Sequence, residues 1–281
     1  PLRISSSNYP IGISYESGTS AQLKSAVILA GLNSYGNTEI TEKLRSRDHT
    51  ENFLVKNKNA IKIDNGKIKK IKIYGKKNLR NFSINVPGDP SSAAFFTALT
   101  LLKKNSYLKI KNIGLNPTRI GFYSLLKKSG AKISFLNKKK VNDELVGDIV
   151  VKSGRLHPIN ASKEYYLNTT DEYPILFIMS AFIKGKSSFS GILDLKNKES
   201  DRIREMQKIL KQIGIYSKYK NDKLIIFGKQ FKKKEIKKIK VPSLGDHRIC
   251  QSAAILGLLT GLTVEIKNFE TVRTSAPSFL K

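Results

Sequence analysis

Residues 171–183 read DEYPILFIMSAFI, and this stretch predicts an α-helix that starts with two acids and has an almost wholly apolar body. Acidic side chains and proline are both common in the first turn of a helix. Gly185 follows at a place where a helix end favours a left-handed residue. The alternation from Ser187 to Ser190 then predicts a half-buried strand. A helix followed directly by a strand indicates one half of an α/β unit.

The other half of this unit is a second, more amphipathic helix that begins near Arg202. Apolar residues recur there at the spacing of one inward-facing helix surface, at Ile203, Met206, Leu210 and Ile213. Gly214 predicts the end of this helix. The unit therefore has the order helix, strand, helix, strand.

The same unit recurs along the chain at intervals of roughly 75 residues. Further apolar helices are predicted at Ser20 to Leu32, Ser91 to Leu102 and Asp246 to Leu259. Strands are predicted after them at Thr38 to Ile40, Tyr107 to Ile110 and Thr263 to Ile266, with helix-ending glycines at Gly36 and Gly261. An arginine follows each strand, at Arg47, Arg119, Arg202 and Arg273. Repetition of this kind predicts an α/β fold in which the N-termini of equivalent helices point the same way. Their free N–H groups and partial positive charge favour a polyanionic ligand.

A turn rich in proline and glycine, Val86-Pro87-Gly88-Asp89-Pro90, separates two of the units and predicts a domain boundary. Residues 1–86 then hold about one unit and form a partial domain. Residues 87–281 hold close to three units and form a nearly complete domain. The chain opens at Pro1 without a methionine and stops at Lys281, so we expect it to be part of a longer protein.

The composition is that of a globular protein: 281 residues, of which 40% are hydrophobic. The net charge of +29 raises the alternative of a nucleic-acid-binding module. Its basic residues are mostly lysines spread along the whole chain, which instead indicates a solvated, lysine-rich surface. Cys250 is the single cysteine, which excludes an internal disulfide, and with three histidines no metal site is expected. The stretch from Ile249 to Val264 is shorter than the ~20 apolar residues of a membrane span, so it predicts a buried helix and a cytoplasmic protein.

The sequence Lys198-Glu199-Ser200-Asp201-Arg202 lies at a predicted helix start, where Ser200 or Asp201 could cap. Glu199 and Arg202 are three residues apart and share a helix face. A carboxylate fixed between two cations at the positive end of a helix can bind a phosphate or carboxylate and also transfer a proton. The alternative is a solvated first turn with local ion pairs.

Other polar groups occupy equivalent helix starts. They are Gly18-Thr19-Ser20-Ala21-Gln22, Arg45-Ser46-Arg47-Asp48-His49, Thr170-Asp171-Glu172 and Leu244-Gly245-Asp246-His247-Arg248. Each taken alone suits a helix cap or a surface loop as well as an anion site. Because all of them stand at the same point of the repeat, we expect folding to gather them into one cleft.

Seven motifs occur in the order, and nearly at the spacing, of one enzyme family. They are Ser20-Ala21-Gln22 with Lys24-Ser25-Ala26, Ser46-Arg47-Asp48-His49-Thr50-Glu51, Val86-Pro87-Gly88-Asp89-Pro90-Ser91-Ser92, Asn116-Pro117-Thr118-Arg119, Asp171-Glu172-Tyr173-Pro174, Lys198-Glu199-Ser200-Asp201-Arg202 and Asp246-His247-Arg248. Together they resemble the 3-phosphoshikimate 1-carboxyvinyltransferase (EPSP synthase) family, and more its bacterial class II form than class I. The resemblance implies an enolpyruvyl transferase fold of two domains, an inside-out α/β barrel of repeated βαβαββ units. It also implies a monomeric enzyme that uses no cofactor and no metal.

The resemblance further implies the reaction and the roles of residues. The 5-hydroxyl of shikimate 3-phosphate adds to C2 of phosphoenolpyruvate while C3 is protonated, and phosphate is then lost, in the pathway to chorismate and the aromatic amino acids. By position, Asp171 acts on the 5-hydroxyl as base and Glu199 carries the proton at C3. The residues implied for shikimate 3-phosphate are Ser20, Ala21, Gln22, Arg47, Asp171 and Lys198, and those for phosphoenolpyruvate are Gln22, Arg202, His247 and Arg248. These partners are small molecules, with no nucleic acid and no membrane.

The departures from the family are mainly absences. Family members carry a glycine-rich segment with a lysine, a serine and an arginine ahead of the part matched here, so we expect this chain alone to be inactive or weak. An alternative is a non-catalytic remnant. The related transferase that acts on UDP-N-acetylglucosamine is a further alternative, although the Lys-Glu-Ser-Asp-Arg and Asp-His-Arg motifs are not expected in it.

Overall fold

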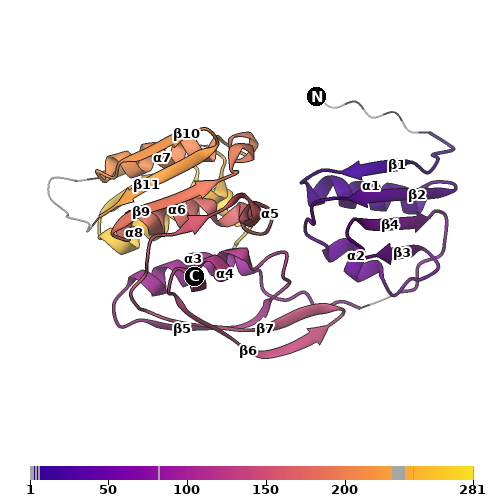
Figure 1. Cartoon of the computed structure of the whole chain (residues 1–281), viewed down its shortest axis with the longest axis horizontal. Coiled ribbons are helices and arrows are strands. Elements are labelled where there is room, and N and C mark those ends of the chain that lie inside the picture. Colours follow the sequence, from indigo (N-terminus) through magenta and orange to yellow (C-terminus); the bar gives the residue numbers. More distant parts are fainter. Residues whose placement is uncertain are drawn as a thin grey trace. The chain divides into compact units, whose positions relative to one another are not determined.

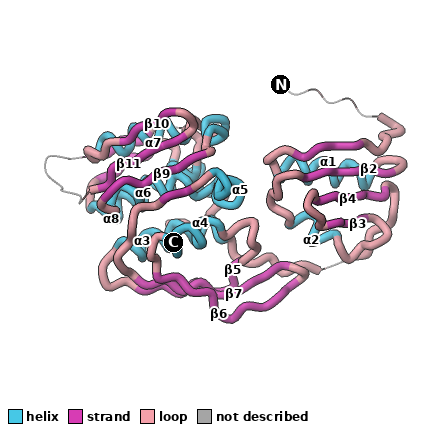
Figure 2. The backbone as a smooth tube through the Cα atoms, in the orientation of Figure 1, coloured by secondary structure: helices cyan, strands magenta, loops and turns pink. Residues whose placement is uncertain are grey.

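The computed structural model describes residues 3, 5, 7–81, 83–229, 238–242 and 244–280. The chain divides into two compact units, which are treated separately below. Unit 1 comprises Pro1–Val86 with Lys140–Glu144, and unit 2 comprises Pro87–Lys139 with Leu145–Lys281. Figure 1 labels the elements, and Figure 2 shows helices and strands alternating along both units.

Unit 1 contains one repeat with the order βαβαββ. Its elements are β1 (Ser14–Ser17), α1 (Ala21–Asn33), β2 (Asn37–Glu42), α2 (His49–Leu54), β3 (Ile61–Asp64) and β4 (Lys69–Tyr74). They form a four-stranded sheet in the order β1-β2-β4-β3, in which β1 and β2 are parallel and the other pairs antiparallel. The small core is built mainly of isoleucines from α1, β2, β3 and β4.

Unit 2 contains close to three further repeats. The first consists of α3 (Pro90–Leu102), β5 (Tyr107–Gly114), α4 (Gly121–Lys128), β6 (Lys132–Val141) and β7 (Glu144–Lys152), with strand order β5-β7-β6. The second consists of β8 (Asn160–Ala161), the short helix α5 (Tyr166–Thr169), α6 (Tyr173–Phe182), β9 (Gly185–Ser190), α7 (Arg202–Gln212), β10 (Ser217–Lys220) and β11 (Lys223–Gly228), with strand order β10-β11-β9-β8. The third consists of β12 (Lys238–Val241), α8 (His247–Thr260) and β13 (Thr263–Ile266), whose two strands are parallel. Short 3-10 helices cover Lys163–Tyr165, Thr170–Glu172, Leu193–Asn197 and Phe269–Thr274.

The core of unit 2 forms where α3, α6 and α8 pack against one another. Nearly every side chain of α6 is buried, as its apolar sequence predicts. The inward face predicted for α7 is also confirmed, because Ile203, Met206 and Leu210 are buried. Cys250 is buried in α8. Three packed helices bring their N-terminal turns close together, and this arrangement positions the candidate site.

The four apolar helices and the four strands that follow them are all confirmed, with ends that differ by at most four residues from the predicted ones. The predicted glycine caps are only partly right. Gly261 does end α8 in the left-handed conformation, with φ 65°. By contrast, α1 ends at the extended residue Ser34, whose hydroxyl donates to the carbonyl of Ala30, so Gly36 lies beyond the helix end. The C-cap of α6 is likewise an extended residue, Ile183.

Two lysines depart from the expectation that lysine decorates a solvated surface. Lys24 in α1 and Lys69 in β4 are buried, with 0% and 5% of their surface exposed. Both ammonium groups lie against buried carboxylates, which offset the desolvation of the charge. In the part of the chain that the structure describes, no helix is long and apolar enough to cross a membrane.

Candidate active site

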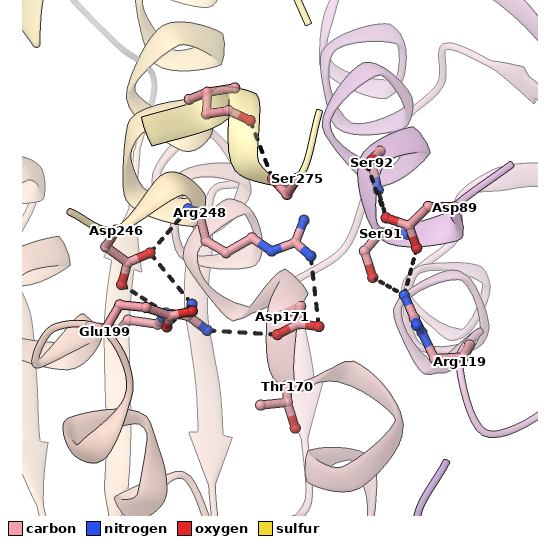
Figure 3. A network of polar contacts seen from close by, with 12 residues as sticks. Asp89, Ser91, Ser92, Arg119, Thr170, Asp171, Glu199, Asp246, Arg248 and Ser275 are labelled. Atoms are coloured by element: carbon pink, nitrogen blue, oxygen red, sulfur yellow. Dashed lines mark hydrogen bonds and ion pairs between the residues drawn. The ribbon is translucent and has the colours of Figure 1, made fainter. Parts of the chain in front are cut away.

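The candidate site of unit 2 lies where α3, α6 and α8 begin (Figure 3). Asp89 caps α3 and Asp246 caps α8, each accepting backbone N–H groups of the first turn. Asp171 and Glu172 precede α6 in a short 3-10 turn. Because helix N-termini carry partial positive charge, carboxylates stabilise them and anions are attracted to them. The expectation that polar helix starts gather together is confirmed for this unit.

Asp246 is the central acceptor of the network. It is fully buried, and its Oδ1 accepts from the backbone N–H of Arg248 at 3.0 Å. Its Oδ2 accepts from Arg202 Nε and from Ser200 Oγ, both at 2.9 Å. One carboxylate therefore fixes the start of α8 and also the start of α7. Asp201, not Ser200, is the side chain that caps α7.

Arg202 is the largest of the fully buried side chains of the described residues, with 1% exposure. Its Nη2 donates to Glu199 Oε2 at 2.6 Å, and its Nη1 lies 3.8 Å from Asp171 Oδ1. Burial lowers the pKa of Arg202, but the carboxylates of Asp246, Glu199 and Asp171 outweigh that effect and raise it. Arg202 is therefore a fixed cation.

Asp171 lies between two arginines. Its Oδ2 is 3.7 Å from Arg248 Nη2, and its Oδ1 faces Arg202 as described above. Despite these contacts, Arg202 Nη1, Arg248 Nε and Arg248 Nη1 are buried and, among the described residues, have no hydrogen-bond acceptor. An unsatisfied buried donor costs about 1–3 kcal/mol and more for charged groups. Two buried guanidinium groups with spare donors are suited to bind an anion.

Glu199 differs from its partner in exposure, since 45% of its side chain is accessible and only 1% of that of Arg202 is. The carboxylate is thus held at 2.6 Å by a buried arginine while one side of it faces solvent. Such a group is fixed in place and can still exchange a proton with a ligand. This geometry suits the proton-transfer role that the resemblance implies for Glu199.

A third arginine completes the site. Arg119 Nη2 donates to Asp89 Oδ1 at 2.6 Å and to Ser91 Oγ at 2.8 Å. Burial raises the pKa of Asp89, and the charge of Arg119 and the N–H of Ser92 more than reverse this, so the pKa lies below its ordinary value. Burial, followed by the charge of Asp171, raises the pKa of the neighbouring Glu172.

Two further implied site residues, Lys198 and His247, also belong to unit 2. Lys198 Nζ lies 2.7 Å from Asp194 Oδ2, an oxygen that also accepts from the hydroxyl of Tyr166. His247 is half-buried at the first position of α8. Lys198 is therefore held by a local ion pair, as expected if the motif were only a solvated first turn. Glu199 and Arg202 instead belong to the network around Asp246.

His247 is expected to be neutral at pH 7. Burial and the charge of Arg248 lower its pKa below 6.5, against smaller opposite effects of Glu199 and Asp246. Because the folded-state pKa is the lower one, the contribution of His247 to stability is complete above pH 6.5 and is lost as pH falls through the folded value. An NMR titration of the imidazole should show this midpoint, and Arg248→Met should raise it. A midpoint above 6.5 in the unchanged protein would contradict the geometry.

The remaining implied site residues lie in unit 1, at the start of α1 and in the loop after β2. Ser20 caps α1 by accepting the N–H of Leu23 at 3.3 Å, and its hydroxyl donates to Gln22 Oε1 at 3.3 Å. Ala21 is the first residue of the helix, and Arg47 is half-buried in the loop. Ser20 and Gln22 thus present polar groups beside free helix N–H groups, as a phosphate site does.

Sequence reasoning missed Asp246 and Asp89 as site residues and treated them as candidate caps or turn residues. Arg119 was recognised in the repeat and received no role. The available signal was the repeat itself, because Arg119 occupies the place of Arg202.

Among the described residues, no group of three or more His, Cys, Asp and Glu side chains is placed to hold a metal ion.

Comparison with known proteins gives one consistent result. The family described as EPSP synthase (3-phosphoshikimate 1-carboxyvinyltransferase) matches residues 1–281. The 3-phosphoshikimate 1-carboxyvinyltransferase of Petrotoga mobilis is 41% identical over 266 residues, covering 92% of this chain and 59% of the relative. That of Zymomonas mobilis is 40% identical, covering 92% and 58%, and that of Aquifex aeolicus is 39% identical, covering 99% and 64%. The chain thus spans about three fifths of the length of these relatives.

Solved structures agree with this match. EPSP synthase of Acinetobacter baumannii has a TM-score of 0.83 and 36% identity, covering 96% of this chain and 61% of its own. The enolpyruvyl transferase NikO of Streptomyces tendae has a TM-score of 0.68 at 13% identity, covering 98% and 63%, which is a likeness of fold alone. The predicted enolpyruvyl transferase fold is confirmed.

Proposed function

Because the chain belongs to the EPSP synthase (3-phosphoshikimate 1-carboxyvinyltransferase) family, we propose that it is part of an enzyme that makes 5-enolpyruvylshikimate 3-phosphate. The enzyme transfers the enolpyruvyl group of phosphoenolpyruvate to the 5-hydroxyl of shikimate 3-phosphate and releases phosphate. This is a step toward chorismate and the aromatic amino acids. The chain without the remaining regions found in its relatives is inactive or weak.

The observation that carries the proposal is the pair of buried arginines with spare donors. Phosphoenolpyruvate bears a phosphate and a carboxylate, and guanidinium groups bind both in a bidentate manner. Arg202 Nη1 together with Arg248 Nε and Nη1 supplies three buried donor nitrogens for such an anion. Gln22 and neutral His247 complete the phosphoenolpyruvate site as hydrogen-bonding groups.

Shikimate 3-phosphate is held by Ser20, Ala21, Gln22, Arg47, Asp171 and Lys198. The hydroxyl of Ser20 and the amide of Gln22 stand at a helix N-terminus, where a phosphate is favoured. Arg47 and Lys198 supply the positive charge for the phosphate. Asp171 is the acceptor for the 5-hydroxyl.

The chemistry consists of an addition followed by an elimination. Asp171, which has an arginine near each of its oxygens, takes the proton of the 5-hydroxyl as the oxygen attacks C2 of phosphoenolpyruvate. Glu199 delivers a proton to C3 in the same step and removes one from C3 when the C2–O bond to phosphate breaks. The second step restores the double bond and frees phosphate, which takes up the proton that Asp171 accepted, so both carboxyl groups return to their starting states. The arginines bind the phosphate in both steps, so they also stabilise the charge of the leaving group.

We further propose that the enzyme is a cytoplasmic monomer that acts on small molecules. It uses no cofactor or metal and binds neither nucleic acid nor a membrane. The lysine-rich surface serves solubility and attracts the two anionic substrates.

The test is phosphate release by the protein that the whole gene encodes. We expect release from phosphoenolpyruvate only when shikimate 3-phosphate is added, and none with UDP-N-acetylglucosamine as acceptor. Release with the nucleotide sugar alone would favour the related transferase. No release with either acceptor would refute the proposal.

A further inference from the structure

Unit 1 contains a buried ionic cluster of two lysines and two glutamates. Lys24 Nζ lies 2.9 Å from Glu42 Oε1 and 2.8 Å from Glu51 Oε1. Lys69 Nζ lies 2.9 Å from Glu51 Oε1 and 3.9 Å from Glu42 Oε2. The four side chains are between 0% and 5% exposed. Two ammonium groups thus balance the charge of two carboxylates inside a unit whose apolar core is small.

The cluster connects the two polar segments of unit 1 that were assigned to substrate. Lys24 belongs to α1, two residues after Gln22, and is the only charged side chain of that helix. Glu42 ends β2, and its Oε1 accepts from the backbone N–H of Ser46 at 2.9 Å and from Ser46 Oγ at 2.6 Å. Ser46 directly precedes Arg47. A single carboxylate oxygen therefore contacts the ammonium group of α1 and the loop that carries Arg47.

Stability alone is a poor explanation for such a cluster. Burying ion pairs loses hydration of every charge, and well-packed apolar side chains of similar size are often as stabilising. What the charges add is a fixed geometry, because each carboxylate and ammonium group must keep its partner. Burial raises the pKa of Glu42, but hydrogen bonds from Ser46 and Lys24 outweigh burial and keep the pKa below its ordinary value. Glu42 is therefore ionised at neutral pH.

We propose that Lys24, Glu42 and Ser46 are positioning residues for the phosphate of shikimate 3-phosphate. Through them the cluster sets the separation between the start of α1, with Ser20 and Gln22, and the loop with Arg47. None of the three contacts the substrate itself. The inference rests on the proposed function, and it adds residues to which the resemblance gave no role.

The decisive variant is Ser46→Ala, which removes one hydrogen bond to Glu42 and nearly preserves volume. Its matched control is Ser34→Ala, which removes a buried serine hydroxyl at the opposite end of α1. In the protein that the whole gene encodes, we expect Ser46→Ala to raise the dissociation constant and KM for shikimate 3-phosphate about tenfold, a loss typical for one hydrogen bond to a charged group. The turnover number and the KM for phosphoenolpyruvate should stay within about twofold, and Ser34→Ala should change neither KM.

The variant Glu42→Gln, measured by amide exchange and by KM, tests the same role independently. Glu42→Gln keeps an acceptor for the Ser46 N–H and removes the charge, so we expect faster amide exchange at Ser46 and Arg47 and the same selective rise in KM. Equal KM changes in Ser46→Ala and Ser34→Ala, or unchanged exchange in Glu42→Gln, would overturn the positioning role. If the unchanged protein does not bind shikimate 3-phosphate, the proposed function fails, while the exchange measurement still reports whether the cluster holds the loop.

Discussion

Replacing Glu199 with glutamine is expected to lower the turnover number by about a hundredfold or more, because a positioned general acid or base contributes roughly that much. Glutamine keeps an oxygen that can accept from Arg202 Nη2, so the buried arginine retains a partner. The dissociation constants of both substrates should therefore change by less than about threefold. Steady-state kinetics together with titration calorimetry would measure the two effects separately.

The matched control for this variant is Glu205→Gln on α7. Glu205 also forms an ion pair with a cation three residues later, Lys208, at 2.7 Å. Glu205 is not among the carboxylates that pair with Arg202, which are Asp171, Glu199 and Asp246. Removing the charge of Glu205 should therefore leave the turnover number unchanged. If Glu199→Gln and Glu205→Gln turned over at the same rate as the unchanged enzyme, Glu199 would have no part in proton transfer.

Replacing Asp246 with alanine should cause the largest loss of stability among the site residues. The change removes the cap of α8 and leaves Arg202 buried beside fewer carboxylates, which together cost about 3–5 kcal/mol. Hydrogen exchange of the α8 amide groups would measure the local free energy of opening. Phosphoenolpyruvate binding should fall as well, since Arg202 and Arg248 both lose their shared anchor.

Asp201→Ala provides the comparison for Asp246→Ala. Asp201 caps α7 at the surface, where its Oδ1 accepts from the backbone N–H of Arg204 at 3.0 Å. The ion pairs described for Arg202 are with Asp171, Glu199 and Asp246. Its loss should cost about 1 kcal/mol, as for an ordinary cap. Similar losses in both variants would mean that Asp246 is only a cap and that Arg202 does not depend on it.

Much of the fold was predictable because it depends on local signals. The helices α1, α3, α6 and α8 combine a polar start with an apolar body, and the following strands alternate. Their ends were less accurate, since helix ends depend on single hydrogen bonds such as that of Ser34 to Ala30. The ion pair of Glu199 with Arg202 was predicted from their spacing and is present, but Glu199 lies in the bend before α7, so a shared helix face is not its cause.

The tertiary partners could not be predicted in the same way. Arg202 and Asp246 are 44 residues apart, and nothing in their local sequence joins them. Lys24 and Lys69 resembled the many surface lysines of the chain, and their burial follows only from the pairing of β2 with β4 and from the packing of α1 on both. The resemblance named the residues that are proposed to bind the substrates, whereas the roles of Asp246 and Glu42 in holding those residues appear only in the folded structure.

The central claim is that an enolpyruvyl group moves intact from phosphoenolpyruvate to shikimate 3-phosphate. Carbon-13 NMR with phosphoenolpyruvate labelled at C2, added to shikimate 3-phosphate and the protein that the whole gene encodes, follows this carbon directly. We predict that the label appears in an enol ether of shikimate 3-phosphate while one phosphate is released for each transfer. A label that stays in phosphoenolpyruvate, or that ends in pyruvate, would contradict it.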